Sequence, residues 1–468
     1  MSNDAGAKII DVEIAELSAA GDGVASAGRL RIAVPFTIPG ERVRVRLDPG
    51  RNGRIYPALL EILHASPHRV RARCIHFGPD AEPGLGACGG CAWQHIAYPE
   101  QLRLKTALVN RLVGSAMPGA PRAQETLPAT PLDRPWGYRN KVHFVFGNLR
   151  FGGRRHDTTL VMGHYARGSR RVIPVRECPV HDERGNAFAF RARDTFASAA
   201  LSAAGADGGV LRSLAVRVGC HTEELMATVV VSSDSDRRLR TATRRLLEED
   251  PPTSVHLNLH ERDDAFVFGE RTRRLRGSER MREEVAGASF LMSPPAFFQT
   301  NVRAAEILVG LVLAAIPEHS YVVDLYAGCG LFAIPLALAG HDVVAVEENR
   351  LAVADGEAAM RLNAVARNRC RFVARRVETA IGSIRRADAV VLDPPRDGCA
   401  ASVLQQVFGR LRPARAVYVS CNPEALAADL ATVCAAGYRI RSMQPVDMFP
   451  HTAHVETVAV FDRYDLRN

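Results

Sequence analysis

Short apolar runs that each stop at a polar or glycine-rich turn recur through the last third of the chain. Three of them cover residues 322–325, 389–392 and 416–419, and segments of helix length separate them. Runs of this kind, bounded by turn residues, are typical of buried strands in an open α/β sheet. Ligands bind at the carboxyl ends of the strands in such sheets. The pattern therefore predicts a Rossmann-like α/β domain over residues 291–468, with its site along one sheet edge.

The first 65 residues show a different pattern, in which apolar and polar positions alternate. Residues 8–14, 30–35 and 41–47 alternate in this way, and glycine-rich turns separate them. Short alternating strands with such turns predict a small β-barrel of OB type over residues 1–65. One predicted strand would present three arginines on a single face, which suits either a phosphate backbone or plain solvent: Arg42, Arg44 and Arg46.

The middle of the chain mixes both kinds of element. Residues 215–218 and 225–231 resemble strands, whereas residues 188–201 and 237–247 have the length and polarity of helices. This mixture predicts an α+β domain over residues 66–290. The protein is therefore expected to be multidomain, with a barrel, a central α+β domain and a C-terminal α/β domain.

Composition narrows the class of protein. The 468 residues are 47% hydrophobic and 24% charged, as in globular proteins, and the formal net charge is +9. Arginine carries nearly all of the basic charge, which suits phosphate contacts and favours a nucleic-acid partner. No stretch approaches the roughly 18–20 apolar residues of a membrane span, and the start lacks a secretory leader. We therefore expect a cytoplasmic monomer with no membrane or protein partner.

Cys421 is the first candidate for chemistry. It follows the apolar run 416–419 and precedes Asn422-Pro423, which cannot continue a strand. A thiol at the carboxyl end of a strand can act as a nucleophile once it is ionised. A lone cysteine is more often a packing residue, so the position alone leaves both interpretations open.

A second group of cysteines has the spacing of a metal site. Cys88-Gly89-Gly90-Cys91 forms a CxxC motif, with Cys74 before it and Cys178 after it. Four thiolates can hold either Zn²⁺ or an iron–sulfur cluster, and the spacing does not separate the two. The interval between Cys74 and Cys88 contains an apparent inserted loop from Asp80 to Gly86.

A glycine-rich turn indicates a nucleotide-containing ligand. Gly328 and Gly330 follow the apolar run 322–325, and Glu347 ends the next one. Glycines permit a tight turn and a close approach of the ligand, and an acid at the second strand end can bind ribose hydroxyls. The turn also satisfies a loose dinucleotide fingerprint, so S-adenosylmethionine and NAD(P) both remain candidates at this point.

Four motifs together are similar to those of one enzyme family. They are DLYAGCG at 324–330, VLDPPRDG at 391–398, VSCNP at 419–423 and DMFPHTAHVE at 447–456. This set resembles the RNA 5-methyluridine methyltransferases of the RumA/TrmA type, and the barrel is similar to the TRAM domain of such enzymes. The CGGC motif and the barrel look more like the 23S ribosomal RNA branch than the tRNA branch.

The resemblance implies a role for each candidate. Cys421 would be the nucleophile and Glu456 the base, and S-adenosyl-L-methionine would be the methyl donor. A [4Fe-4S] cluster would be held by four cysteines: Cys74, Cys88, Cys91 and Cys178. The donor and the target base would meet five further residues: Gln299, Tyr326, Gly328, Glu347 and Asp393.

The chemistry explains why a cysteine and an acid are both needed. Uracil C5 is a weak nucleophile until a thiolate adds to C6, and a base must later remove the C5 proton. The predicted function is thus methylation of uridine C5 in RNA, most simply 23S rRNA, on a base flipped into the site. Three alternatives are a tRNA uridine methylase, an RNA-binding iron–sulfur or zinc protein with an inactive methylase domain, and an NAD(P) oxidoreductase.

Overall fold

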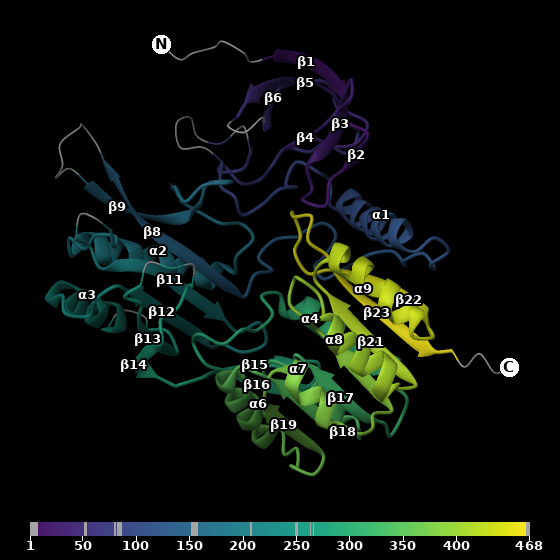
Figure 1. Ribbon diagram of the computed structural model, residues 1–468. Helices are drawn as coiled ribbons and strands as arrows, with labels where there is room; N and C mark the ends of the chain where they lie inside the picture. The colour runs from purple at the N-terminus through teal and green to yellow at the C-terminus, as the bar shows by residue number, and fades with distance from the viewer. Residues whose placement is uncertain are drawn as a thin grey trace.

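The computed structural model describes residues 8–50, 54–78, 81, 87–150, 158–205, 208–248, 251–262, 264 and 266–464. Apart from residue 81, the predicted inserted loop from Asp80 to Gly86 lies outside this part of the chain. Figure 1 shows three groups of elements: a small strand assembly at the top, a helix-backed sheet at the left and a second helix-covered sheet at the lower right.

The strand assembly consists of two three-stranded sheets around one core, with strand orders β1-β5-β6 and β2-β3-β4. Apolar and polar residues alternate along these strands, so that one face of each strand is buried. In β5, Val43, Val45 and Leu47 point into the core, while the residues between them face outward. The strands are β1 (Lys8–Glu13), β2 (Glu16–Leu17), β3 (Gly23–Ala27), β4 (Leu30–Val34), β5 (Arg42–Pro49) and β6 (Ile55–His64).

The arginines of β5 lie on the outer face, as the alternation predicts. Arg44 is bound by two acids from the neighbouring strands, Asp11 and Glu61, and Arg46 is paired with Asp48. Two of the three side chains are therefore engaged within the barrel itself.

The central sheet has seven strands in the order β10-β9-β8-β11-β12-β13-β14. They are β8 (Lys141–Arg150), β9 (Thr158–Tyr165), β10 (Val172–Pro174), β11 (Leu211–Val218), β12 (Leu225–Val231), β13 (Ser254–Leu259) and β14 (Arg271–Gly277). Helices α2 (Glu183–Ser198) and α3 (Arg237–Glu248) bury their apolar sides against this sheet in one core. A hairpin of β15 (Met281–Val285) and β16 (Ala288–Met292) then leads to the last sheet.

The last sheet has eight strands in the order β19-β18-β17-β20-β21-β23-β22-β7. Its parallel part comprises β17 (Tyr321–Leu325), β18 (Asp342–Glu347), β19 (Cys370–Ala374), β20 (Ala389–Leu392) and β21 (Arg415–Ser420). Strand β23 (Glu456–Arg463) runs antiparallel to both β21 and β22 (Tyr438–Asp447). The chain order reverses at β17, which makes its carboxyl end the switch point of the sheet.

Helices cover both faces of this sheet, which is why its central strands β20 and β21 are nearly continuous buried apolar runs rather than alternating ones. One face packs against α4 (Val302–Ala315), α5 (Ala333–Leu338) and α6 (Arg350–Leu362). The other packs against α1 (Tyr98–Ala116), α7 (Val377–Ala380), α8 (Ala401–Leu404) and α9 (Pro423–Ala435), together with the 3₁₀ turn Ile381–Ser383 and the π-helical segment Gln405–Leu411.

Two elements from early in the chain are part of the C-terminal α/β unit: a helix that packs on it and a short strand that joins its sheet. Helix α1 packs on α9 and β22, and the two-residue strand β7 (Leu127–Pro128) pairs with the end of β22. Both fall inside the range 66–290 predicted for the central domain. The predicted fold class, a barrel followed by mixed α/β domains, is confirmed, whereas the residue ranges of the three domains stay a prediction. Within the described residues, no helix has the length and apolar character needed to cross a bilayer.

Candidate active site and cysteine cavity

Strand register brings Asp393, Cys421 and Glu456 to one place at the sheet edge. Leu392, the last residue of β20, lies opposite Tyr418 of β21, and Ser420 at the end of β21 lies opposite Thr457 of β23. Cys421 therefore leaves the sheet beside Glu456, the first residue of β23. Asp393 leaves β20 on the other side of β21.

The sequence after β21 fixes how Cys421 is presented. Asn422 caps helix α9, its side chain accepting a hydrogen bond from the Glu424 amide at 3.0 Å, and Pro423 occupies the first helical position. The Asn422 amide also donates to Ser420 Oγ at 3.2 Å. Cys421 thus sits, half-buried, in the single step between a strand and a helix N-terminus, where the helix dipole favours a thiolate.

Burial sets the charge of these groups. It raises the pKa of Glu456 to about 8, with the nearby Asp393 adding to the rise, and it raises the pKa of Asp393 to about 7. The pKa of the Cys421 thiol rises to about 11, through burial first and then through Glu456 and Asp393. The Arg396 guanidinium acts in the opposite direction on both Cys421 and Glu456. Glu456 and the Cys421 thiol therefore hold their protons near neutral pH, and the Arg396 cation favours the loss of those protons.

The glycine-rich turn after β17 forms the neighbouring part of the edge. Tyr326, Gly328 and Gly330 all have positive φ angles, of 64°, 55° and 91°. The Glu347 carboxylate accepts hydrogen bonds from the Gly328 amide at 2.9 Å and the Asn349 amide at 2.7 Å, so it braces the turn. A Cβ added at Gly328 would meet nothing within 4 Å, which leaves open space for a ligand at the switch point.

Gln299 lies on a different segment, the connection between β16 and α4. It lines a small cavity of about 10 Å³ together with Lys141 and Arg217. The helix that follows begins as predicted, with Asn301 capping it through the Ala304 amide at 3.2 Å. The Asn301 side chain also donates to the Met448 carbonyl at 3.0 Å, which ties this segment to the end of β22.

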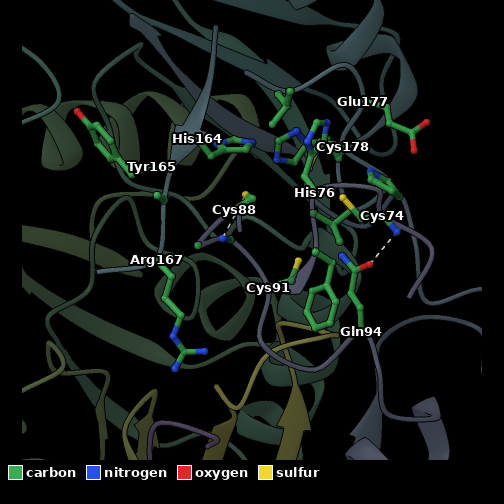
Figure 2. A pocket seen from close by; sticks show the side chains of 18 of the residues that line it. Cys74, His76, Cys88, Cys91, Gln94, His164, Tyr165, Arg167, Glu177 and Cys178 are labelled. Atoms are coloured by element: carbon green, nitrogen blue, oxygen red, sulfur yellow. Dashed lines mark hydrogen bonds between the residues drawn. The ribbon is translucent and has the colours of Figure 1, made fainter. Parts of the chain in front are cut away.

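The four predicted metal-site cysteines lie together around one cavity. Its volume is about 330 Å³, and Cys74, Cys88, Cys91 and Cys178 all line it (Figure 2). Hydrogen bonds shape the surrounding loops: the Cys74 amide donates to Gln94 Oε1 at 3.1 Å, and the Gly90 amide points at the Cys88 sulfur at 3.4 Å. Residues more than 80 positions apart in the sequence thereby converge on one space.

The chemistry of the cavity fits a metal centre. Burial raises the pKa of the four thiols, those of Cys74 and Cys91 to about 11, so the thiolates need a cation to form there. His164 Nε2 and His181 Nδ1 are buried and have no hydrogen-bond partner among the described residues. Ligand atoms of both histidines and of Cys178 lie within 4.8 Å of one another. Unpartnered buried nitrogens beside four thiols are a donor set suited to a soft metal or a cluster.

Comparisons with known proteins agree with the geometry. A family model described as tRNA (Uracil-5-)-methyltransferase matches residues 284–464, and the TRAM-domain model of tRNA (uracil(54)-C(5))-methyltransferase matches residues 10–67. A protein of Gloeobacter violaceus named as an uncharacterized RNA methyltransferase is 36% identical over 461 residues, covering 97% of this chain and 96% of that protein. A protein of Halalkalibacterium halodurans, also named as an uncharacterized RNA methyltransferase, is 30% identical, and the match covers 97% of each chain. The chain belongs to the RNA (uracil-5-)-methyltransferase family.

A solved structure supports the same assignment. The tRNA (uracil-54, C5)-methyltransferase of Pyrococcus abyssi, in complex with S-adenosyl-L-homocysteine, is 25% identical with a TM-score of 0.76. The match covers 97% of this chain and 100% of that one. The protein is thus an RNA methyltransferase with an N-terminal TRAM domain, and the alternative of an NAD(P) oxidoreductase is wrong.

The methyltransferase also contains site residues that the sequence analysis did not single out. Arg396 lies in the VLDPPRDG motif, but nothing in the motif shows that its charge acts on Cys421 and Glu456. Asp324 is fully buried near the end of β17, and burial, followed by Asp393, raises its pKa well above the usual value. The sequence did offer one signal for Asp324, because it is an acid within an otherwise apolar strand, and acids are rarely buried in such strands.

Proposed function

We propose that the methyltransferase transfers a methyl group to C5 of a uridine in RNA, with Cys421 as nucleophile and Glu456 as base. The observation that carries this proposal is the strand register, which puts the thiol, Glu456 and Asp393 at one end of adjacent strands. A thiol and an acid at the same end of adjacent strands suit a reaction that needs both in sequence.

The steps follow from the chemistry of uracil. The Cys421 thiolate adds to C6, and the electrons of the C5–C6 double bond move toward the O4 carbonyl. C5 then attacks the methyl carbon of S-adenosylmethionine, whose sulfur departs as the neutral thioether. Glu456 removes the remaining C5 proton, the double bond reforms, and the thiolate leaves C6. No oxidant or reductant is consumed.

Two groups would make this sequence feasible near neutral pH. Arg396 favours the ionised forms of Cys421 and Glu456, and the N-terminus of α9 adds its dipole behind the thiol. The negative charge that appears on uracil O4 needs a donor, and the protonated Asp393, with its pKa near 7, is the candidate at this sheet edge.

We also propose how the methyl donor is held. Gly328 leaves room for the donor at the switch point, and Tyr326 would lie against its adenosine. Glu347 would receive the ribose hydroxyls on carboxylate lone pairs not used by the turn amides. Gln299 would approach from the β16–α4 connection.

We propose that Cys74, Cys88, Cys91 and Cys178 hold a [4Fe-4S] cluster. Bound there, the cluster would cross-link three separate chain segments, and no step of methyl transfer passes through it. Protein purified without oxygen should be brown and contain about four iron and four sulfide per chain. A colourless protein with one zinc would contradict the cluster and leave a zinc site in its place.

For the RNA substrate we propose 23S rRNA, on the resemblance of the CGGC motif to the ribosomal RNA branch. A second candidate, tRNA, is favoured by the full-length similarity to the Pyrococcus abyssi tRNA enzyme. The TRAM domain does not separate the two, because the matching TRAM model itself comes from a tRNA methyltransferase.

The test offers labelled S-adenosylmethionine with unmodified 23S rRNA and unmodified tRNA side by side, using Cys421→Ala as the control. Label in one RNA that the variant abolishes would support the mechanism and identify the substrate. Label that persists in Cys421→Ala would contradict the covalent mechanism. A folded, metal-loaded wild-type protein that labels neither RNA would favour an RNA-binding protein with an inactive methylase domain.

A further inference from the structure

The connection between β22 and β23, residues 448–455, leads directly into Glu456, and hydrogen bonds from distant parts of the chain hold it in place. Four consecutive backbone carbonyls, those of residues 448–451, each accept a hydrogen bond from a residue distant in sequence. Asn301 Nδ2 donates to the first at 3.0 Å, Lys105 Nζ to the second at 3.0 Å and Tyr138 Oη to the third at 2.9 Å. Loop carbonyls are ordinarily left to solvent, so this segment is fixed by the rest of the molecule.

The fourth carbonyl joins the segment to the cysteine cavity. The amides of Ala92 and Trp93, the two residues after Cys91, both donate to the His451 carbonyl at 2.9 Å. Gln101 closes the same junction from the other side. Its Oε1 accepts from the His451 amide at 2.8 Å, and its Nε2 donates to the Trp93 carbonyl at 3.1 Å.

A second route runs from the other end of the cavity. The residues after Cys178 are bonded to the strand-like stretch around Tyr138: the Gly137 amide donates to the Pro179 carbonyl at 2.9 Å, and the Arg139 amide donates to the Val180 carbonyl at 2.9 Å. Tyr138, between those two anchored residues, is the donor to the third carbonyl of the 448–455 segment. Both the Cys91 and the Cys178 sides of the cavity therefore reach this segment.

The far end of the segment reaches the reacting groups. Arg396 Nη2 donates to the His454 ring at 3.2 Å, and Glu456 follows two residues later. The segment thus touches the cysteine cavity at His451, the activating cation at His454 and the candidate base at its end.

We propose that the cysteine site positions Glu456 through the 448–455 segment, so that loss of the metal centre slows removal of the C5 proton. His451 and His454 are positioning residues in this arrangement. The inference rests on the proposed function, because it assigns the site a task within that mechanism.

A misplaced base has a distinctive consequence. Addition of the thiolate and transfer of the methyl group precede the step that needs Glu456, so both can still occur. The RNA then stays attached to Cys421 through its C6–S bond, with the new methyl group and the original hydrogen both on C5. Impaired positioning therefore accumulates a methylated covalent complex, whereas a general loss of structure prevents its formation.

Gln101→Met distinguishes impaired positioning from a general loss of structure. It removes the side-chain hydrogen bonds that join His451 to Trp93 and leaves every cysteine in place. Gln444→Met is the matched control: Gln444 is also buried and also donates its side-chain amide to backbone carbonyls, those of Glu125 and Pro445. With labelled donor and the RNA that the wild-type protein methylates, free product should form about 10–100-fold more slowly in Gln101→Met. The label should remain in a protein–RNA band on a denaturing gel, while metal content matches the wild type and Gln444→Met behaves normally.

Hydrogen–deuterium exchange supplies a readout that does not need activity. Exchange across residues 448–455 should accelerate in Gln101→Met, in metal-depleted wild type and in Cys91→Ser, but not in Cys434→Ser, whose half-buried thiol lies on α9 outside the cavity. Exchange of β17 and β18 should stay unchanged.

Unchanged exchange in the metal-depleted protein, or a Gln101→Met variant without excess adduct, would overturn the inference and leave the proposed function standing. A wild-type protein that transfers methyl groups without any Cys421-dependent adduct would overturn the proposed function and the inference with it.

Discussion

Replacing Glu456 by glutamine should make the protein more stable while removing its turnover. Glu456 is buried, with 4% of its surface exposed, and its pKa lies near 8 instead of 4.5. The folded protein therefore holds the neutral acid at pH values where the unfolded chain holds the carboxylate. Glutamine has nearly the shape of the neutral acid and cannot ionise, so it escapes this penalty.

The sign and size follow from proton linkage. Below pH 4.5 both states carry the proton and the substitution should change little. Between pH 4.5 and about 8 only the unfolded chain ionises, so the wild-type protein loses stability as pH rises. At about 1.4 kcal/mol per pKa unit, the advantage of Glu456→Gln should reach about 3 kcal/mol at pH 7 and level off near 5 kcal/mol above pH 8.

Urea unfolding at a series of pH values from 4 to 9 measures this difference, with the folded state followed by hydrogen exchange or fluorescence. Glu424→Gln serves as the control, since Glu424 is exposed on α9 and its replacement should produce no comparable trend. A Glu456→Gln protein that is no more stable than wild type at pH 8, or whose advantage does not grow with pH, would refute the assignment of Glu456 as a buried, protonated acid.

Methyl transfer should accelerate as pH rises from about 6 to 8, because Glu456 must lose its proton and the Cys421 thiol must ionise, and it should level off above pH 8, where Asp393 has lost the proton that it would donate; initial rates that fall between pH 6 and 8 would contradict the roles of Cys421 and Glu456. Lys105→Met should lower the free energy of unfolding by about 3–5 kcal/mol, since it leaves Asp447 buried without its cation, and adding Asp447→Leu should restore much of the loss in urea titrations. Gly330→Ala should destabilise by about 1–3 kcal/mol and weaken donor binding in calorimetry, because its φ is 91° and an added Cβ would lie 2.8 Å from an aromatic ring atom.

Local patterns were sufficient to predict much of the fold and part of the site. The apolar runs ending at Asp393 and Cys421 are strands because both faces of the sheet are covered, and the turn residues after them mark the functional edge. The helix expected after Asn301 begins there because its side chain caps the first turn. The metal-site cysteines could be grouped from spacing and resemblance, and the structure places them around one cavity.

Other features depend on contacts that no local pattern encodes. Strand β7 has only two residues, Leu127 and Pro128, too few for any periodicity, and its place is set by pairing with β22. Gln101 has the polarity of an exposed helix residue, yet it is fully buried because the 448–455 segment folds over it. His164 occupies a polar position of a strand, and only the arrangement of three distant segments turns it toward the cysteines.

The pairing of Lys105 with Asp447 also has a consequence for synthesis. The two residues are 342 positions apart, so a ribosome adding about 5–20 residues per second completes Asp447 roughly 20–70 s after Lys105. Throughout that interval α1 lacks α9 and β22, and β7 has no strand to join. The nascent chain must carry this amphipathic helix through most of its own translation, which makes α1 a natural point of contact for a chaperone at the ribosome.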